Sequence, residues 1–182
     1  MIDHCRQIAM NEKVTANEKR KWYISWDQYF MAVALVSGER SKDPVTQVGA
    51  CIVNADKRIV GIGYNGMPNG CTDDDMPWGK GSNNILETKK LYVCHAEMNA
   101  IVNKISADIR GCMMYVSLHP CNNCAKIIIQ SGIREVVYYD DKNRHKDEFK
   151  ASQYLFKKAG VIVRKYSSSS IVLSLGPFKC RL

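Results

Sequence analysis

Four residues in two short motifs have the types and spacing of a reactive metal centre. His95 and Glu97 lie two residues apart, and Cys121 and Cys124 form a Cys-x-x-Cys pair further along the chain. One imidazole and two thiolates are strong zinc ligands, and three protein ligands leave the fourth position of a tetrahedral zinc open for water, as in catalytic sites. The set therefore predicts a zinc-activated water, with Glu97 outside the ligand set as its general base.

The spacing of the two cysteines favours metal binding. Residues three apart share one side of a helical first turn, where backbone N–H groups and the positive helix end lower the pKa of a thiol. Two thiolates cancel the charge of Zn²⁺, so this zinc should be a weaker Lewis acid than one bound by imidazoles alone. We therefore expect catalysis to depend strongly on the neighbouring base, Glu97.

Alternative sites use the same residues. A Cys-x-x-Cys pair alone also occurs in redox and structural sites, and Cys94 beside His95 offers a fourth ligand for a closed Cys₃His site. Adjacent residues rarely bind one tetrahedral ion together, and a closed site gives Glu97 no role, so the catalytic interpretation is favoured. His119, which precedes Pro120, is expected to line the pocket or the surface.

The elements that must position these residues begin with a helix and a hairpin. Ser25 with Gln28 three residues on forms a capping-box pattern, which predicts a helix that starts there and stops at Gly38. Two β-rich runs, 47–54 and 58–64, predict a hairpin. A long irregular segment follows, and loops of this length are usually functional or disordered.

Strands and helices then alternate. A helix should open at the first metal motif, with a buried stripe at i, i+3, i+4 and i+7 that comprises Met98, Ile101, Val102 and Ile105. Strands are predicted at 112–118, 135–139 and 161–164, and helices at 122–131 and 147–159. This order predicts an α/β protein, a single three-layer domain with a mixed five-stranded sheet and helices on both faces. Both metal motifs would then lie at helix N-termini that meet at one edge of the sheet.

The composition is that of one soluble domain. The 182 residues are 46% hydrophobic and 24% charged, with a net charge of +8. No apolar run approaches the roughly 20 residues of a membrane span, and the N-terminus lacks the apolar core of a secretory signal, so a cytoplasmic protein is expected. We predict a basic N-terminal extension over 1–21, the zinc-dependent domain over 22–166, and a C-terminal tail over 167–182 with a candidate extra strand at 171–175.

The chain resembles animal-type deoxycytidylate (dCMP) deaminases of the cytidine deaminase superfamily, roughly from Trp26 to Arg164. The pattern His-x-Glu…Pro-Cys-x-x-Cys is the signature of zinc-dependent nucleobase deaminases, and it specifies only the superfamily. The Gly- and Asn-rich stretch 61–71 narrows the resemblance to dCMP deaminases. The segments that carry the resemblance are 29–34, 40–44, 47–50, 61–71, 94–100 and 120–126.

The resemblance implies a cytidine deaminase-like fold and a hydrolase that converts dCMP to dUMP and ammonia for thymidylate synthesis. His95, Cys121 and Cys124 would bind Zn²⁺. Glu97 would take a proton from the activated water, pass it to the ring nitrogen of the pyrimidine, and then protonate the departing ammonia.

The resemblance also implies how the substrate is bound. Asn65 matches the asparagine that holds the sugar 3′-hydroxyl, and the backbone of Ala96 would face the pyrimidine O2. The basic and hydroxyl run Arg40, Ser41 and Lys42 is the candidate for the 5′-phosphate, with a solvated helix end as the alternative.

Members of this family are typically homohexamers that dCTP with Mg²⁺ activates and dTTP inhibits. The candidate allosteric residues lie in the loop after the second strand and are Asn65, Gly66, Met67, Asn69 and Gly70. Glycines there let backbone amides approach phosphates. The acidic run 73–75 is a candidate for Mg²⁺, with a solvated acidic turn as the alternative.

The chain departs from its relatives at two positions, and other functions remain open. Asn143 stands where many relatives have a pocket tyrosine, and His119 replaces an aromatic residue. The alternatives are a polynucleotide cytosine or adenine deaminase, a deaminase of the free nucleoside, and a non-enzymatic zinc-stabilised binding module. A nucleic acid polymer is not expected, because Lys and Arg cluster mainly in the tails and the aromatic pair Tyr29 and Phe30 is expected in the core.

Overall fold

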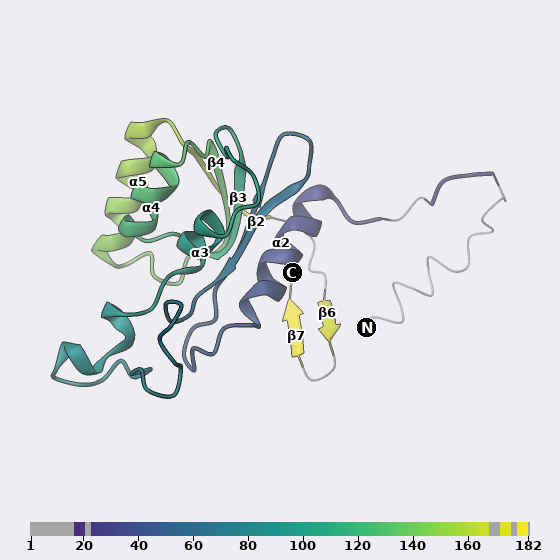
Figure 1. The fold of residues 1–182 in the computed structure, drawn as a ribbon. Coiled ribbons are helices and arrows are strands. Elements are labelled where there is room, and N and C mark those ends of the chain that lie inside the picture. Colours follow the sequence, from purple (N-terminus) through teal and green to yellow (C-terminus); the bar gives the residue numbers. More distant parts are fainter. Residues whose placement is uncertain (1–16, 21–22, 168–171, 176–177, 182) are drawn as a thin grey trace.

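A five-stranded sheet forms the centre of the protein in the computed structural model, which describes residues 17–20, 23–167, 172–175 and 178–181 (Figure 1). The strands lie in the order β2-β1-β3-β4-β5. β1 pairs antiparallel with β2 and β3, whereas β3, β4 and β5 are parallel. The strands are β1 (Gly49–Val53), β2 (Ile59–Tyr64), β3 (Met113–Leu118), β4 (Glu135–Asp140) and β5 (Ile162–Lys165). The predicted mixed sheet is confirmed.

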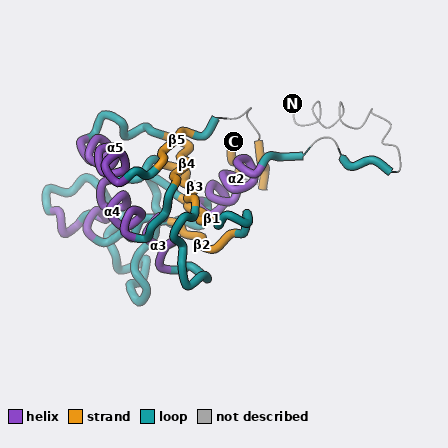
Figure 2. Tube along the Cα trace, turned by 90° about the horizontal axis from the view of Figure 1, so that it is seen from above, coloured by secondary structure: helices purple, strands orange, loops and turns teal. Residues whose placement is uncertain are grey.

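Helices cover both faces of this sheet, as predicted. Figure 2 shows α2 on one side and α3, α4 and α5 on the other. The helices are α2 (Trp26–Gly38), α3 (Ala96–Val102), α4 (Asn122–Gln130) and α5 (Asp147–Ala159). The side chains of β1 alternate between two cores: Ala50 and Ile52 pack toward α3 and α4, while Cys51 and Val53 pack toward α2. The three-layer architecture follows from this alternation.

The helix boundaries follow local sequence signals. At the start of α2, the Gln28 N–H donates to the Ser25 Oγ at 3.2 Å and the Ser25 N–H donates to the Gln28 Oε1 at 2.8 Å, so the predicted capping box is present. At the end of α5, Gly160 adopts the left-handed conformation with φ 70°, which a glycine reaches without strain.

The predicted buried stripe of α3 is wrong. The helix ends at Val102, which is largely exposed, and Ile105 beyond it is 85% exposed. The buried residues of the helix are Ala96, Glu97, Ala100 and Ile101, and the two that lie against β2 are the small ones, Ala96 and Ala100. Small residues face inward because the strand beneath them presents Gly61 and Gly63, so that α3 and β2 approach backbone to backbone.

We expect the substitution Gly63→Ala to destabilise the protein by about 1–3 kcal/mol or more, because it overpacks a tight contact. A Cβ at this position would lie 2.3 Å from the Ala100 N and 2.4 Å from the Ala96 O, both backbone atoms that no rotamer change can move. The measurement is the free energy of unfolding in urea. Gly79→Ala is the matched control, since nothing lies within 4 Å of the added atom. Equal unfolding midpoints for both variants would contradict this account of the contact.

The segments outside the sheet differ in part from expectation. The predicted C-terminal strand exists as β6 (Val172–Leu175), but it pairs with β7 (Phe178–Arg181) in a separate two-stranded sheet.

Of the aromatic pair expected in the core, Phe30 is buried and Tyr29 is 42% exposed. Most of the basic extension, residues 1–16 and 21–22, lies outside the described residues, and the domain boundaries stay a prediction. No helix among the described residues is long and apolar enough to cross a membrane.

Candidate metal centre and substrate site

The starts of two helices bring the predicted zinc ligands together. His95 is the N-cap of α3, Cys121 is the N-cap of α4, and Cys124 lies in the first turn of α4. The His95 Nδ1 is 3.5 Å from the Cys121 Sγ and 3.3 Å from the Cys124 Sγ. A tetrahedral zinc with ordinary Zn–S and Zn–N bonds requires about 3.5 Å between such atoms. The three ligand atoms therefore fit one zinc ion.

The three ligand groups form hydrogen bonds with one another, and these bonds shift their pKa values. The pKa of Cys121 is lowered to about 3, because its sulfur is hydrogen-bonded by the Cys124 thiol and by His95. The pKa of Cys124 is raised, because its proton serves that hydrogen bond and the thiol is buried. The hydrogen bond to Cys121 raises the pKa of His95 to about 9. Without a metal, His95, Cys121 and Cys124 thus share protons among their ligand atoms. A metal ion that binds these atoms would displace those protons.

Glu97 lies beside this group in the first turn of α3. Glu97 is 4% exposed. This burial raises the pKa of its carboxyl group, and the positive charge of His95 opposes the shift. A carboxyl group whose pKa is raised holds a proton more readily than an exposed one, which suits a group that must accept a proton and return it. Ala96, which precedes it and opens the helix, is fully buried.

Asn65 lies at the end of β2 with almost all of its hydrogen-bonding capacity in use. Its Nδ2 donates to the Asp43 Oδ2 at 3.2 Å and to the Thr46 carbonyl at 3.0 Å, and its Oδ1 accepts from the Val48 N–H at 2.8 Å. Both amide hydrogens are occupied, so one acceptor position on Oδ1 is left. Asn65 can therefore bind a ligand group that donates a hydrogen bond, such as a hydroxyl.

The loop that follows Asn65 is joined to the metal centre through the backbone. Gly66 and Cys94 exchange two hydrogen bonds, 3.1 Å from the Gly66 N–H and 2.9 Å from the Cys94 N–H. The Asn99 side chain of α3 donates to the Tyr64 carbonyl at 2.8 Å. These contacts hold the start of the candidate allosteric loop beside the residue that precedes His95.

The three candidate phosphate residues have different surroundings. Ser41 donates through its Oγ to the Asn65 carbonyl at 2.8 Å, which links it to the substrate side of the site. Lys42 forms an exposed ion pair with Asp73 of the acidic run, and Arg40 is exposed. The acidic run gathers no metal group. Among the described residues, His95, Cys121 and Cys124 are the one set of three His, Cys, Asp or Glu side chains whose ligand atoms converge.

A group of lysines near this site was not predicted from the sequence. The pKa of Lys80 is lowered, first by desolvation and then by the positive charges of Lys89, Lys146 and Lys142, while Asp43 opposes the shift. Lys142 and Lys146 belong to the loop after β4 that also carries Asn143. The only signal in the sequence was the net charge of +8, for which Lys and Arg in solvated tails were the expected source.

His119 is a core residue, so it does not line the surface, and its place beside the pocket stays a prediction. It is buried, with its ring 4.1 Å from that of Phe149 and 4.7 Å from that of Tyr138, centroid to centroid. Its Nδ1 lies 2.9 Å from the Pro120 carbonyl, and its Nε2 has no hydrogen-bond partner within the described residues. His119 thus fills an aromatic packing position between β3, β4 and α5.

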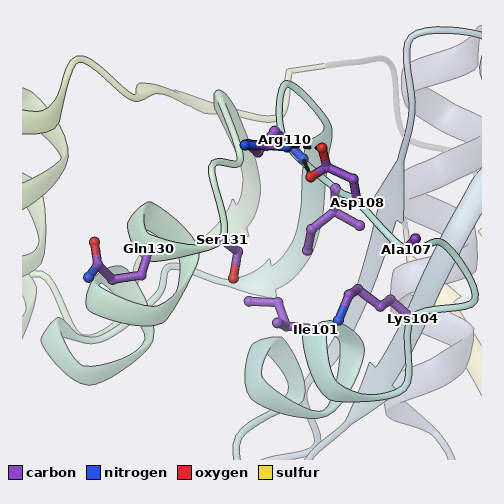
Figure 3. Close-up of a pocket in the computed structure, with 8 residues that line it drawn as sticks. Ile101, Lys104, Ala107, Asp108, Arg110, Gln130 and Ser131 are labelled. Carbon is purple, nitrogen blue, oxygen red and sulfur yellow. Dashed lines mark hydrogen bonds and ion pairs between the residues drawn. The ribbon is translucent and has the colours of Figure 1, made fainter.

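A cavity lies away from the metal centre. This cavity of about 230 Å³ is lined from the ends of α3 and α4 and from the segment before β3 (Figure 3). Its lining includes Ile101, Gln130 and Ser131 at the C-terminal ends of the two helices, whereas the zinc ligands lie at their N-terminal ends. The cavity therefore belongs to a different part of the molecule from the candidate catalytic residues.

Comparisons with known proteins agree with this geometry. Residues 24–140 match the family model described as the cytidine and deoxycytidylate deaminase zinc-binding region. The deoxycytidylate deaminases of Mus musculus and Homo sapiens are 57% and 56% identical to this chain over 166 residues, which cover 90% of this chain and 93% of each relative.

A solved structure shares the fold. The dCMP deaminase of the cyanophage S-TIM5, crystallised in complex with dCMP and dUMP, superposes with a TM-score of 0.61 at 27% identity, over 79% of this chain and all of that one. The match of the family model over more than half of the chain, together with the two mammalian relatives, shows that this chain belongs to the cytidine and deoxycytidylate deaminase family.

Proposed function

We propose that this protein is a zinc-dependent hydrolase that deaminates dCMP to dUMP and ammonia. The observation that carries the proposal is the convergence of His95, Cys121 and Cys124 beside the buried Glu97. The similarity to mammalian deoxycytidylate deaminases supports dCMP as the substrate.

The proposed mechanism assigns the proton transfers to one carboxyl group. Zinc bound by His95, Cys121 and Cys124 would supply a water of lowered pKa. Glu97 would take a proton from the attacking water and pass it to the ring nitrogen next to the carbon that carries the amino group. Glu97 then takes the proton of the hydroxyl group added to that carbon and gives it to the amino group, which leaves as ammonia while the carbonyl forms, so the same carboxyl group is base and acid in turn.

Substrate recognition is proposed from the residues around the metal centre. The open acceptor position of Asn65 suits the 3′-hydroxyl of deoxyribose, and the backbone of Ala96 would contact the pyrimidine O2. Arg40, Ser41 and Lys42 are proposed to bind the 5′-phosphate. Lys42 would leave its ion pair with Asp73 and contact the phosphate instead. The positive field of Lys80, Lys142 and Lys146 would assist the binding of an anion.

The loop after β2 is proposed to bind the nucleotides that regulate activity. Its candidate residues are Asn65, Gly66, Met67, Asn69 and Gly70. The loop would bind dCTP with Mg²⁺ as activator or dTTP as inhibitor, in a homohexamer of a cytoplasmic protein. The Gly66–Cys94 backbone pairing supports this, because a shift of the loop would act directly on the residue next to His95. The free thiols among the described residues suit a reducing compartment.

A substrate panel at neutral pH tests both proposals. Ammonia release would be measured for dCMP, CMP, deoxycytidine, dCTP and a single-stranded oligonucleotide, each with and without added dCTP and Mg²⁺. We expect the highest kcat/KM with dCMP, and a sigmoidal dCMP curve that becomes hyperbolic when dCTP is added. A curve that is hyperbolic without dCTP would count against regulation.

The same panel separates the alternatives. Equal turnover of dCMP and the oligonucleotide would favour a polynucleotide deaminase. A higher kcat/KM with deoxycytidine than with dCMP would favour a nucleoside deaminase. Full zinc occupancy without ammonia release from any substrate would favour the binding module.

A further inference from the structure

A buried ion pair joins Asp43, in the loop between α2 and β1, to Lys89, in the long segment before α3. The two side chains are 3% and 7% exposed, and the Lys89 ammonium group contacts both carboxylate oxygens. Burying two charges carries a desolvation cost that their attraction rarely exceeds, and apolar residues at such sites are often as stable or more so. Stability alone therefore does not account for this pair.

Asp43 connects Lys89 to the candidate substrate residue. Its Oδ1 accepts the Val45 N–H at 2.8 Å and the Thr46 N–H at 3.1 Å, and its Oδ2 accepts the Asn65 Nδ2 at 3.2 Å. The carboxylate thus lies between the ammonium group and the Asn65 amide, and it fixes which way that amide faces. A carboxylate without its cation would be a buried, uncompensated charge and would move toward water or take up a proton.

Lys89 is also held in place relative to the metal centre. Its carbonyl accepts the Tyr92 N–H at 3.1 Å and the Val93 N–H at 3.0 Å, and the next residue, Cys94, pairs with Gly66. Lys89 is therefore connected to this region by two routes. Its side chain reaches Asn65 through Asp43, and its backbone leads through Cys94 to Gly66, the residue after Asn65. This closed set of contacts fixes Asn65 with respect to His95.

We propose that Lys89 is a positioning residue for substrate binding. By neutralising and orienting Asp43, it keeps the Asn65 amide turned so that its one open acceptor meets the sugar 3′-hydroxyl of the nucleotide. This inference rests on the proposed function. Lys89 contacts none of the reacting atoms, so its loss should raise KM while kcat stays close to that of the unaltered enzyme.

The test compares dCMP with 2′,3′-dideoxycytidine 5′-monophosphate, which lacks the hydroxyl in question. In Lys89→Met we expect kcat/KM for dCMP to fall about tenfold, the size of one lost hydrogen bond, and mainly through KM. For the dideoxy substrate we expect little change, so the preference for dCMP should disappear. Lys90→Met is the matched control, because Lys90 is the exposed neighbour in the same turn and should keep the preference.

A second variant separates positioning from stability. The double substitution D43N/K89M leaves no unpaired charge in the interior, so its Tm should recover toward that of the unaltered protein while the preference for dCMP stays lost. Added to Asn65→Ala, Lys89→Met should lower the preference no further, because both act on one hydrogen bond.

Each outcome has one interpretation. If the unaltered protein does not deaminate dCMP, the proposed function fails. If it deaminates both substrates equally well, or if D43N/K89M retains the preference for dCMP, the proposed function stands and the role of Lys89 is overturned. A fall in Tm and kcat at unchanged KM and unchanged preference would equally overturn it, because a purely structural role predicts that result.

Discussion

Replacing Glu97 with glutamine is expected to lower kcat for dCMP by about 10⁴-fold, at the upper end of the usual contribution of general acid–base catalysis. The effect should be large because one carboxyl group is assigned both proton transfers. Glutamine keeps the size and hydrogen-bonding reach of the side chain but cannot exchange a proton. Zinc should remain bound, since Glu97 lies outside the convergent ligand group. The measurements are ammonia release under saturating dCMP and the zinc content per chain.

Glu148→Gln is the matched control for this substitution. Glu148 occupies the second position of α5, as Glu97 does in α3, but it is exposed. The control should leave both kcat and zinc content unchanged. Turnover by Glu97→Gln above a tenth of the normal rate would reject the assigned role, and loss of zinc from that variant would place Glu97 among the ligands.

The second large effect is expected from the ligand substitution Cys121→Ser. The hydroxyl of serine remains protonated at neutral pH and is a poor zinc ligand, so zinc affinity should fall at least about 100-fold, more than the usual loss from altering a residue behind the ligands. Activity should fall with zinc occupancy and recover in part at high zinc concentration. Zinc content measured by atomic absorption, alongside ammonia release, tests this expectation.

A control thiol distinguishes ligand loss from a general effect of removing sulfur. Cys71 is exposed and lies in the loop after the second strand, so Cys71→Ser should keep one zinc per chain and normal turnover. Full zinc occupancy in Cys121→Ser would contradict the proposed ligand set.

The parts of the fold that the sequence predicts are those that depend on neighbours in the chain. The capping pair Ser25 and Gln28, the hairpin and the alternating strands and helices all appear close to their expected bounds. The metal ligands were predicted for the same reason, because each motif lies within one helical turn. Local hydrogen bonds and periodicity determine such features almost independently of the tertiary structure.

The failures arise from contacts between distant segments. The face of α3 that packs on β2 is determined by Gly61 and Gly63, which lie more than thirty residues before the helix. Their lack of side chains lets the backbone at Ala96 and Ala100 approach the strand closely. His119 is buried because α5 places Phe149 against it. The ion pair of Asp43 and Lys89 spans 46 positions in the sequence. Local sequence patterns cannot predict contacts between residues that are far apart in the sequence, because these contacts form only when the sheet and helices pack together.

The direct contact of the α3 backbone with β2 also limits how this enzyme can move. Because no side chains lie between Gly63 and the Ala96–Ala100 turn, this interface has no rotamers that could repack when a ligand arrives. We therefore expect helix α3 and strand β2 to move together, with Glu97 in the helix and with His95 and Asn65 at the ends of the two elements. Any induced fit is left to the loop after β4 and to those residues of the long loop before α3 that lie outside the contacts of Lys89 with Asp43 and of Gly66 with Cys94.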